Sequence, residues 1–171
     1  MYVEILILAS LLRQPRHGYE IKRQVQEIVG TIVSINNNQL YPSLRRFEEM
    51  GAITREVVRT PGKPDRHVYQ MTDRGEEILQ DLLREFTPEQ ARDDIEFQIR
   101  VAFFHLVEPE TRLAILAARE AVVKEWQAHL ARSRAILDEH PDYMRFARHV
   151  VTFNLQNIEH ELPGSPSCGK R

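Results

Sequence analysis

The fold of this chain is decided by one stretch, residues 36–51, which reads NNNQLYPSLRRFEEMG. Its apolar residues Leu40, Leu44 and Phe47 recur at intervals of four and three, which is the spacing of one face of an α-helix. The asparagines that precede them are good N-caps, and Gly51 suits the end of a helix. The stretch therefore predicts an amphipathic helix with one packed side and one open side.

The open side of this helix carries groups that bind nucleic acids. Amides and guanidinium groups form hydrogen bonds with base edges and with phosphates. A solvated helix in a protein that binds nothing has similar charges, so this face does not decide the function alone. At about 100° per residue, the side opposite the apolar stripe holds Asn38, Pro42, Arg45, Arg46 and Glu49, with Gln39 and Tyr41 beside it.

The elements around this stretch complete a known motif. Two helices precede it, an apolar one at Val3–Leu12 and a second at Tyr19–Val29. Two β-branched runs follow it, Ala52–Arg59 and Arg66–Met71, and Thr72 or Asp73 then caps another helix. Three helices, a hairpin and a helix is the order of a winged helix-turn-helix, whose third helix reads DNA. The turn between the two runs is rich in Pro and Gly, and the cations on the hairpin are Arg59, Lys63 and Arg66.

Three segments of the chain resemble the PadR family of bacterial regulators: HGYEI at residues 17–21, LYPSLRRFEEMGAI at 40–53 and VYQMTDRG at 68–75. The resemblance covers residues 5–85, and the rest is loosely similar to the helical C-terminal region of longer members. It implies a homodimer that binds an inverted-repeat operator, usually as a repressor. The family often has small residues and Pro where this chain has residues 36–39, so the operator sequence does not carry over.

The second half of the chain predicts helices, at Ile95–Leu106, at Glu108–His140 and from Pro141 to about Leu162. The segment Glu108–His140 would be about 48 Å long at 1.5 Å per residue, which exceeds a small domain. Its apolar side can pack on neighbouring helices of the same chain or on a second copy. We favour dimerisation, because a palindromic operator requires a dimer.

The expected fold class is therefore mainly α, with a winged helix-turn-helix N-terminal domain and a C-terminal helical dimerisation region. We expect domains at residues 1–86 and 87–162 and a flexible tail at 163–171. The residues expected to contact double-stranded DNA are Tyr19, Lys22, Asn38, Gln39, Tyr41, Pro42, Arg45, Arg46, Lys63 and Arg66.

Charge and composition narrow the class of protein. The net charge is −2, but residues 1–74 hold 11 Lys and Arg against 8 Asp and Glu, and the remainder is acidic. The lone Cys168 forms no internal disulfide, and the His residues lack the i, i+4 spacing of zinc ligands. Neither a membrane span nor a signal peptide is expected, which favours a cytoplasmic protein. No enzyme motif, cofactor motif or metal site is recognised.

A small aromatic effector is expected from the resemblance. Trp126 is the candidate stacking partner, with Phe103 and Phe104 as alternatives, although each is also consistent with a core position. Two other functions remain open. One is a DNA-binding regulator or activator without an effector, and the other is a winged helix that contacts proteins.

Overall fold

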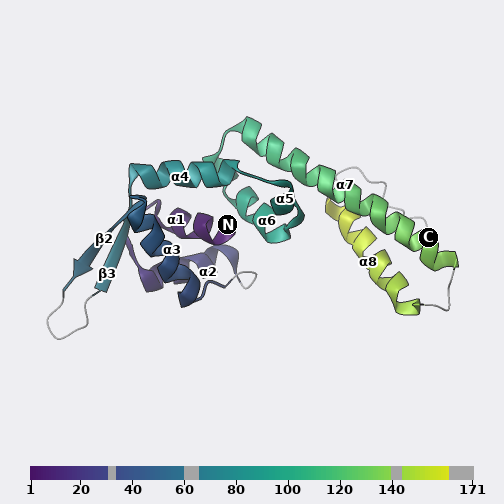
Figure 1. The fold of residues 1–171 in the computed structure, drawn as a ribbon, viewed down its shortest axis with the longest axis horizontal. Coiled ribbons are helices and arrows are strands. Elements are labelled where there is room, and N and C mark those ends of the chain that lie inside the picture. The colour runs from purple at the N-terminus through teal and green to yellow at the C-terminus, as the bar shows by residue number, and fades with distance from the viewer. Residues whose placement is uncertain (31–33, 60–65, 140–143, 162–171) are drawn as a thin grey trace. The chain divides into compact units, whose positions relative to one another are not determined.

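The computed structural model describes residues 1–30, 34–59, 66–139 and 144–161, with only the backbone at residue 145. It is mainly helical with one small sheet, as expected (Figure 1). The elements of the N-terminal part, in chain order, are α1 (Tyr2–Leu11), β1 (Arg16–His17), α2 (Gly18–Val29), α3 (Asn37–Glu49), β2 (Ile53–Val58), β3 (Arg66–Met71) and α4 (Asp73–Arg84). This order and the paired wing strands confirm the winged helix-turn-helix fold.

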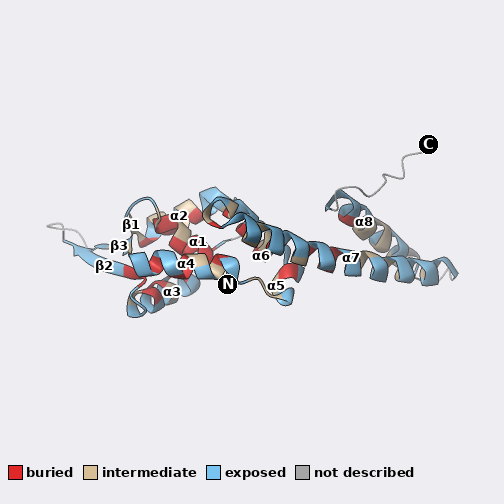
Figure 2. Ribbon diagram, turned by 90° about the horizontal axis from the view of Figure 1, so that it is seen from above, coloured by how far each residue is buried: buried red, intermediate tan, exposed pale blue. Residues whose placement is uncertain are grey.

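Helix α1 is the centre of the N-terminal part. Its residues Ile5, Leu6, Ile7 and Leu8 are each 0% exposed, because apolar side chains occupy every face of the helix. Helices α2, α3 and α4 pack around it. Figure 2 shows the buried residues concentrated on α1 and on the helix faces turned toward it. The surrounding helices are thereby fixed relative to one another.

The wing is a three-stranded antiparallel sheet in the order β1-β3-β2. Strands β2 and β3 pair from Ile53 opposite Met71 to Val58 opposite Arg66. The two-residue strand β1 was not anticipated, since the sequence indicated only a break between the helices Val3–Leu12 and Tyr19–Val29. It pairs with Val68 and Tyr69 of β3, contacts that are distant in sequence. The expected hairpin tip, residues 60–65, lies outside the described residues.

The junction between the wing and α4 is fixed by Thr72 and Gly75. The Thr72 hydroxyl accepts a hydrogen bond from the Gly75 N–H at 3.1 Å and donates to the carbonyl of Gly51 at 2.7 Å. A Cβ atom at Gly75 would lie 2.1 Å from the carbonyl oxygen of Ala52, so no larger residue fits. Thr72 is thus the helix cap, and it ties α4 to the residues that follow α3.

Three short elements follow α4: α5 (Pro88–Arg92), α6 (Asp94–Ala102) and the 3₁₀ turn Phe104–Leu106. The single helix expected over Ile95–Leu106 is wrong at its end, because the chain tightens after Ala102. Arg100 anchors α6. Its guanidinium is fully buried, pairs with Glu96 and donates to the carbonyl of Glu85 at 2.9 Å, which closes the C-terminal end of α4.

The chain divides into two compact units, residues 1–112 and 113–171. The second contains most of α7 (Pro109–Glu139) together with α8 (Arg145–Glu161). Two ion pairs join these helices: Arg119 to Glu161 at 2.5 Å and Arg148 to Asp138 at 2.7 Å. Helices α5 and α6 fall in the first unit, whereas the sequence placed a functional boundary at residue 86; that boundary stays a prediction. Within the described ranges, no helix has the length and apolar character needed to span a bilayer.

Candidate nucleic-acid interface

The start of α3 is fixed by a reciprocal cap. The Asn36 Oδ1 atom accepts from the Gln39 N–H at 3.0 Å, and the Gln39 Oε1 atom accepts from the Asn36 N–H at 3.2 Å. Gln39 was expected to contact DNA. The side-chain oxygen of Gln39 takes part in the cap, which leaves its side-chain NH₂ group for a contact with DNA. The cap therefore fixes where α3 begins.

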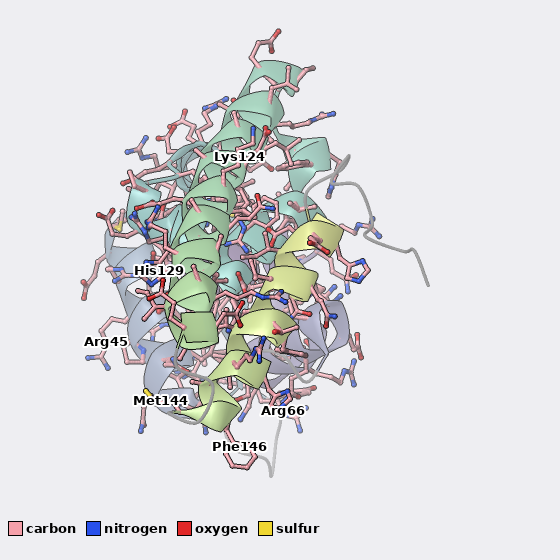
Figure 3. All side chains as sticks on the ribbon, turned by 90° about the vertical axis from the view of Figure 1, so that its right-hand side faces the viewer. Arg45, Arg66, Lys124, His129, Met144 and Phe146 are labelled. Carbon is pink, nitrogen blue, oxygen red and sulfur yellow. The ribbon has the colours of Figure 1, made fainter. Side chains whose placement is uncertain are left out.

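The faces of α3 are those expected from the sequence. Leu40, Leu44 and Phe47 are buried, and Asn38, Tyr41, Pro42 and Arg45 are exposed. Pro42 lies inside the helix, where it cannot donate to the carbonyl of Asn38. Both residues lie on the open side, so that carbonyl can bind water. The Arg45 side chain extends from the protein surface (Figure 3).

Arg46 is held differently from Arg45. Its guanidinium pairs with Glu4 of α1, and its Cζ atom lies 5.6 Å from the centre of the Phe47 ring. The side chain is half exposed, yet its charge is offset by a carboxylate of the same unit. A base contact by Arg46 would have to replace this pair. Arg45 makes no ion pair within the described part of the chain, so it is the better candidate for DNA.

The start of α2 forms a second part of the surface. The rings of His17 and Tyr19 stack, with centroids 5.6 Å apart and planes 9° apart. His17 Nδ1 donates to the carbonyl of His67 at 3.0 Å, which ties the start of α2 to β3. Tyr19 is exposed, and Lys22 lies one turn further along α2 and is half-buried. The first N–H groups of α2 have no partners within their own helix.

The wing supplies Arg66, which is exposed at the first position of β3 (Figure 3). Lys63, also expected to contact DNA, lies outside the described residues. Arg55 of β2 pairs with Glu48 of α3 at 3.2 Å, so this cation is neutralised within the unit. Arg66 is therefore the wing cation that the described structure offers to a ligand.

A pocket of about 280 Å³ lies where these three parts meet. Gly18 forms part of its wall, and a Cβ atom there would lie 3.2 Å from the Tyr41 ring. Tyr41 of α3 thus packs directly over the start of α2. The residues that line the pocket are His17, Gly18, Tyr19, Tyr41, Arg66, His67 and Tyr69.

Four of the lining residues, Gly18 among them, were not singled out by sequence reasoning. His17, His67 and Tyr69 enter the pocket because β1 pairs with β3, which no local pattern indicated. The motif HGYEI placed His17 beside Tyr19, but nothing in the sequence placed it beside His67. To find them from the sequence, one would have had to predict a strand at residues 16–17 that pairs with β3.

The residues considered for an effector lie in different environments. Phe103 is buried in the core of the first unit, and Phe104 packs against that core. Trp126, in the second unit, is half-buried, with the Arg119 guanidinium carbon 5.4 Å from its ring centre. Trp126 and Phe104 are therefore more accessible than Phe103. No cluster of metal-ligating side chains occurs among the described residues.

Comparison with known proteins finds a family match within this unit. Residues 7–81 match the Transcriptional regulator PadR-like family. A probable transcriptional regulator of Mycobacterium tuberculosis is 33% identical over 69 residues, 40% of this chain and 36% of that protein. The negative transcriptional regulator PadR of Bacillus subtilis is 30% identical over 99 residues, 57% of this chain and 53% of that protein. The alignments thus span about a third and about half of these relatives.

The chain is also similar to solved structures. The crystal structure of Bacillus subtilis PadR in complex with operator DNA is 22% identical, covers 92% of this chain and 91% of that chain, and has a TM-score of 0.47. A transcriptional regulator from Clostridium thermocellum is 25% identical, covers 47% of this chain and 77% of that chain, and has a TM-score of 0.44. The family itself is not an enzyme class. Residues 7–81 of this chain therefore form a region that matches the PadR-like family of transcriptional regulators.

Proposed function

We propose that this protein regulates transcription by binding an inverted-repeat DNA operator as a homodimer. The open face of α3 enters the major groove, the start of α2 meets the phosphate backbone, and the wing contacts the flanking DNA. This assignment uses Asn38, Tyr41, Pro42 and Arg45 on α3, with Tyr19, Lys22 and Arg66 around it. Gln39 and Arg46 act in part by fixing α3, since both are bonded within the unit.

The observation that carries this proposal is the meeting of α2, α3 and β3 around one pocket. Residues from all three elements line it, and among them are three of the side chains expected to bind DNA: Tyr19, Tyr41 and Arg66. That surface presents the cation of Arg66, and the lining of its pocket has no carboxylate. A surface of this kind suits a polyanion.

Dimerisation is supported by the apolar surface of α8. Phe146, Val150 and Phe153 follow one another at intervals of four and three, on one face of the helix. They are 79%, 59% and 61% exposed, which is far more than a folded helix normally leaves open in large apolar residues. Figure 3 shows Phe146 projecting from the start of α8. We propose that a second copy covers this face.

The direction of regulation is proposed from a relative. One protein that matches this chain is named a negative transcriptional regulator, which favours repression. A repressor acts by occupying DNA, so it requires no further surface on this chain. The proposal of an activator would require a contact with the transcription machinery.

The test is selection of DNA by the full chain from a random duplex library, followed by binding at several salt concentrations. We expect an inverted repeat whose half-sites lie about 34–36 Å apart, one helical turn. Binding should weaken steeply as salt rises. Sedimentation of the complex should show two copies per duplex. Failure to enrich any sequence, with weak and salt-insensitive binding, would favour a winged helix that contacts proteins.

We also propose that a planar aromatic molecule releases the protein from DNA by stacking near Trp126. The chain has one tryptophan, so its fluorescence reports on this position alone. A set of planar aromatic compounds should quench it saturably, and the compounds that quench should lower operator occupancy. Quenching without release of DNA contradicts the proposal. Release with an unchanged midpoint in Trp126→Phe places the effector elsewhere.

A further inference from the structure

Tyr69 stands out within the pocket between α2, α3 and β3. It is 5% exposed, in the middle strand of the sheet. Among the described residues, none forms a hydrogen bond with its hydroxyl. No fully enclosed side-chain oxygen or nitrogen in that part of the chain lacks a partner, so this hydroxyl must reach accessible space. Since Tyr69 lines the pocket, the open space it meets is the pocket.

The Tyr69 hydroxyl is a hydrogen-bond donor without an acceptor among the described residues. Burial raises the pKa of Tyr69 above its ordinary value of 10.0, so the group stays protonated at neutral pH. The side chain is nearly buried and meets open space in the pocket, so water or a ligand in the pocket is what can accept from this hydroxyl. Evolved structures rarely keep such a group unless a ligand or an ordered water satisfies it. The position of Tyr69 therefore points to a ligand that accepts hydrogen bonds.

The lining of the pocket selects an anion. It consists of one arginine, two histidines, three tyrosines and a glycine, and none of these is acidic. His17 donates from Nδ1 to the carbonyl of His67, so its Nε2 atom takes no part in this hydrogen bond. Gly18 and Tyr19 begin the twelve-residue helix α2, whose first N–H groups favour negative charge. The nearby carboxylates are engaged by other groups: Glu20 accepts from the His17 N–H at 2.8 Å, and Glu48 pairs with Arg55 at 3.2 Å. A pocket with several donors and no carboxylate in its lining suits an oxyanion such as a phosphate.

We propose that this pocket seats one phosphodiester of the DNA backbone in each half-site, and that the Tyr69 hydroxyl donates to its oxygen. The inference rests on the proposed function and adds a contact from the floor of the pocket. Arg66 supplies the charge, and Tyr41 links the bound phosphate to α3. The phosphate thereby sets the depth at which α3 enters the groove. A free phosphate ion has the same chemistry, and the experiment separates the two sources.

The first test compares Tyr69→Phe with Tyr2→Phe, a matched loss of one hydroxyl on α1, away from the pocket. Because a hydrogen bond to a charged group is lost, Tyr69→Phe should bind the selected operator about tenfold more weakly or worse. A scrambled duplex should lose affinity by a similar factor, since a phosphate carries no sequence. Tyr2→Phe should bind as the wild type does. Equal affinity of Tyr69→Phe and wild type for both duplexes overturns the proposal.

The salt dependence separates a neutral donor from a cation. Tyr69→Phe should leave the slope of log affinity against log salt unchanged, because no counterion is released by a hydroxyl. Arg66→Ala should lower that slope by about 0.9. Thermal unfolding of Tyr69→Phe should match the wild type, since the hydroxyl has no partner in the free protein. A large fall in its midpoint would mean that the hydroxyl has a structural partner, and would overturn the proposal.

Single methylphosphonate substitutions in the operator locate the phosphate. At one position per half-site, the substitution should weaken DNA binding by the wild type. At the same position it should weaken binding by Tyr69→Phe only slightly, because this variant has already lost the contact. Additive losses at every position overturn the pocket contact while the DNA-binding function stands. If inorganic phosphate shifts the NMR signals of the pocket residues but no methylphosphonate position couples to Tyr69, the pocket holds a free anion. If the wild type binds no DNA at all, the proposed function itself fails.

Discussion

The two units of this chain treat their apolar residues in opposite ways. In the first, α1 is enclosed on every side, and even Arg100 and Glu96 are buried as a bonded pair. In the second, α7 and α8 keep few buried residues, and large apolar side chains such as Leu113 remain open to solvent. Figure 2 shows this difference as exposed colour along α7 and α8. The proposed dimer would cover the exposed apolar side chains of the second unit, whereas the first unit already encloses its own.

The largest expected effect is a loss of stability of the first unit. Arg100→Met removes the charge that offsets the buried Glu96 carboxylate and the donors to the end of α4. Glu96 keeps the N-terminal ammonium at 3.2 Å and the Tyr2 N–H at 2.9 Å, so the expected loss is the lower end of that for a broken buried ion pair, about 3 kcal/mol of unfolding free energy. Urea unfolding followed by circular dichroism measures it. Arg23→Met, which removes one side of an exposed pair with Glu27, should cost less than about 0.5 kcal/mol.

A smaller effect is expected for Phe153→Asp, which tests the second unit. The ring is exposed in a single copy, so its loss should leave the fold of that copy intact, and a charge should prevent a second copy from covering it. The dissociation constant of the dimer should rise on the order of 30-fold or more, about 2 kcal/mol for a central apolar contact. Sedimentation velocity measures the change. Gln156→Asp, which adds the same charge at another exposed position of α8, should remain dimeric; an unchanged dimer in Phe153→Asp contradicts the comparison.

The fold was predictable to the extent that it is local. The apolar stripe of α3, the run of buried residues in α1 and the Thr72 cap are set by neighbours within a few positions, and they were expected correctly. Strand β1 was missed because its partner lies about fifty residues away. The fold class and the family were therefore within reach of the sequence, while the pairing that closes the sheet was not.

The candidate site was predictable in its elements and less so in its individual side chains. Helical periodicity placed Gln39 and Arg46 on or beside the open face. It could not show that Gln39 bonds the cap or that Arg46 pairs with Glu4, 42 residues earlier. Tyr69 was missed for the same reason. Its role depends on an unbonded hydroxyl at the floor of a pocket, and no sequence pattern records that.

A pH titration would sharpen the description of the first unit. Burial alone would raise the pKa of Glu96, but hydrogen bonds from Arg100 and from the backbone N–H of Tyr2 outweigh it and lower the pKa below 4.5. The carboxylate therefore stabilises the fold above pH 4.5, and this contribution is lost as the pH falls through the lowered folded pKa. Urea unfolding of wild type and Glu96→Gln should differ most near neutral pH. Their free energies of unfolding should converge below pH 4.5, and a constant difference at all pH values would contradict this assignment.

The smallest effect is expected where the second unit is held together internally. Trp126 lies over the Arg119 guanidinium, which in turn pairs with Glu161 of α8. Such a contact between a cation and an aromatic face is worth about 0.5–1 kcal/mol where solvent has access. Trp126→Phe keeps an aromatic ring that attracts a cation less strongly, so it should lower the free energy of unfolding by less than that.

If a partner supplies most of the stability of α7 and α8, the unfolding midpoints of the wild type and of Trp126→Phe should rise with protein concentration to the same extent. Circular dichroism melts at several concentrations test this without relying on tryptophan fluorescence. A loss of several kcal/mol in Trp126→Phe, with midpoints independent of concentration, would mean that internal contacts stabilise the second unit and that its open apolar face has no need of a second copy.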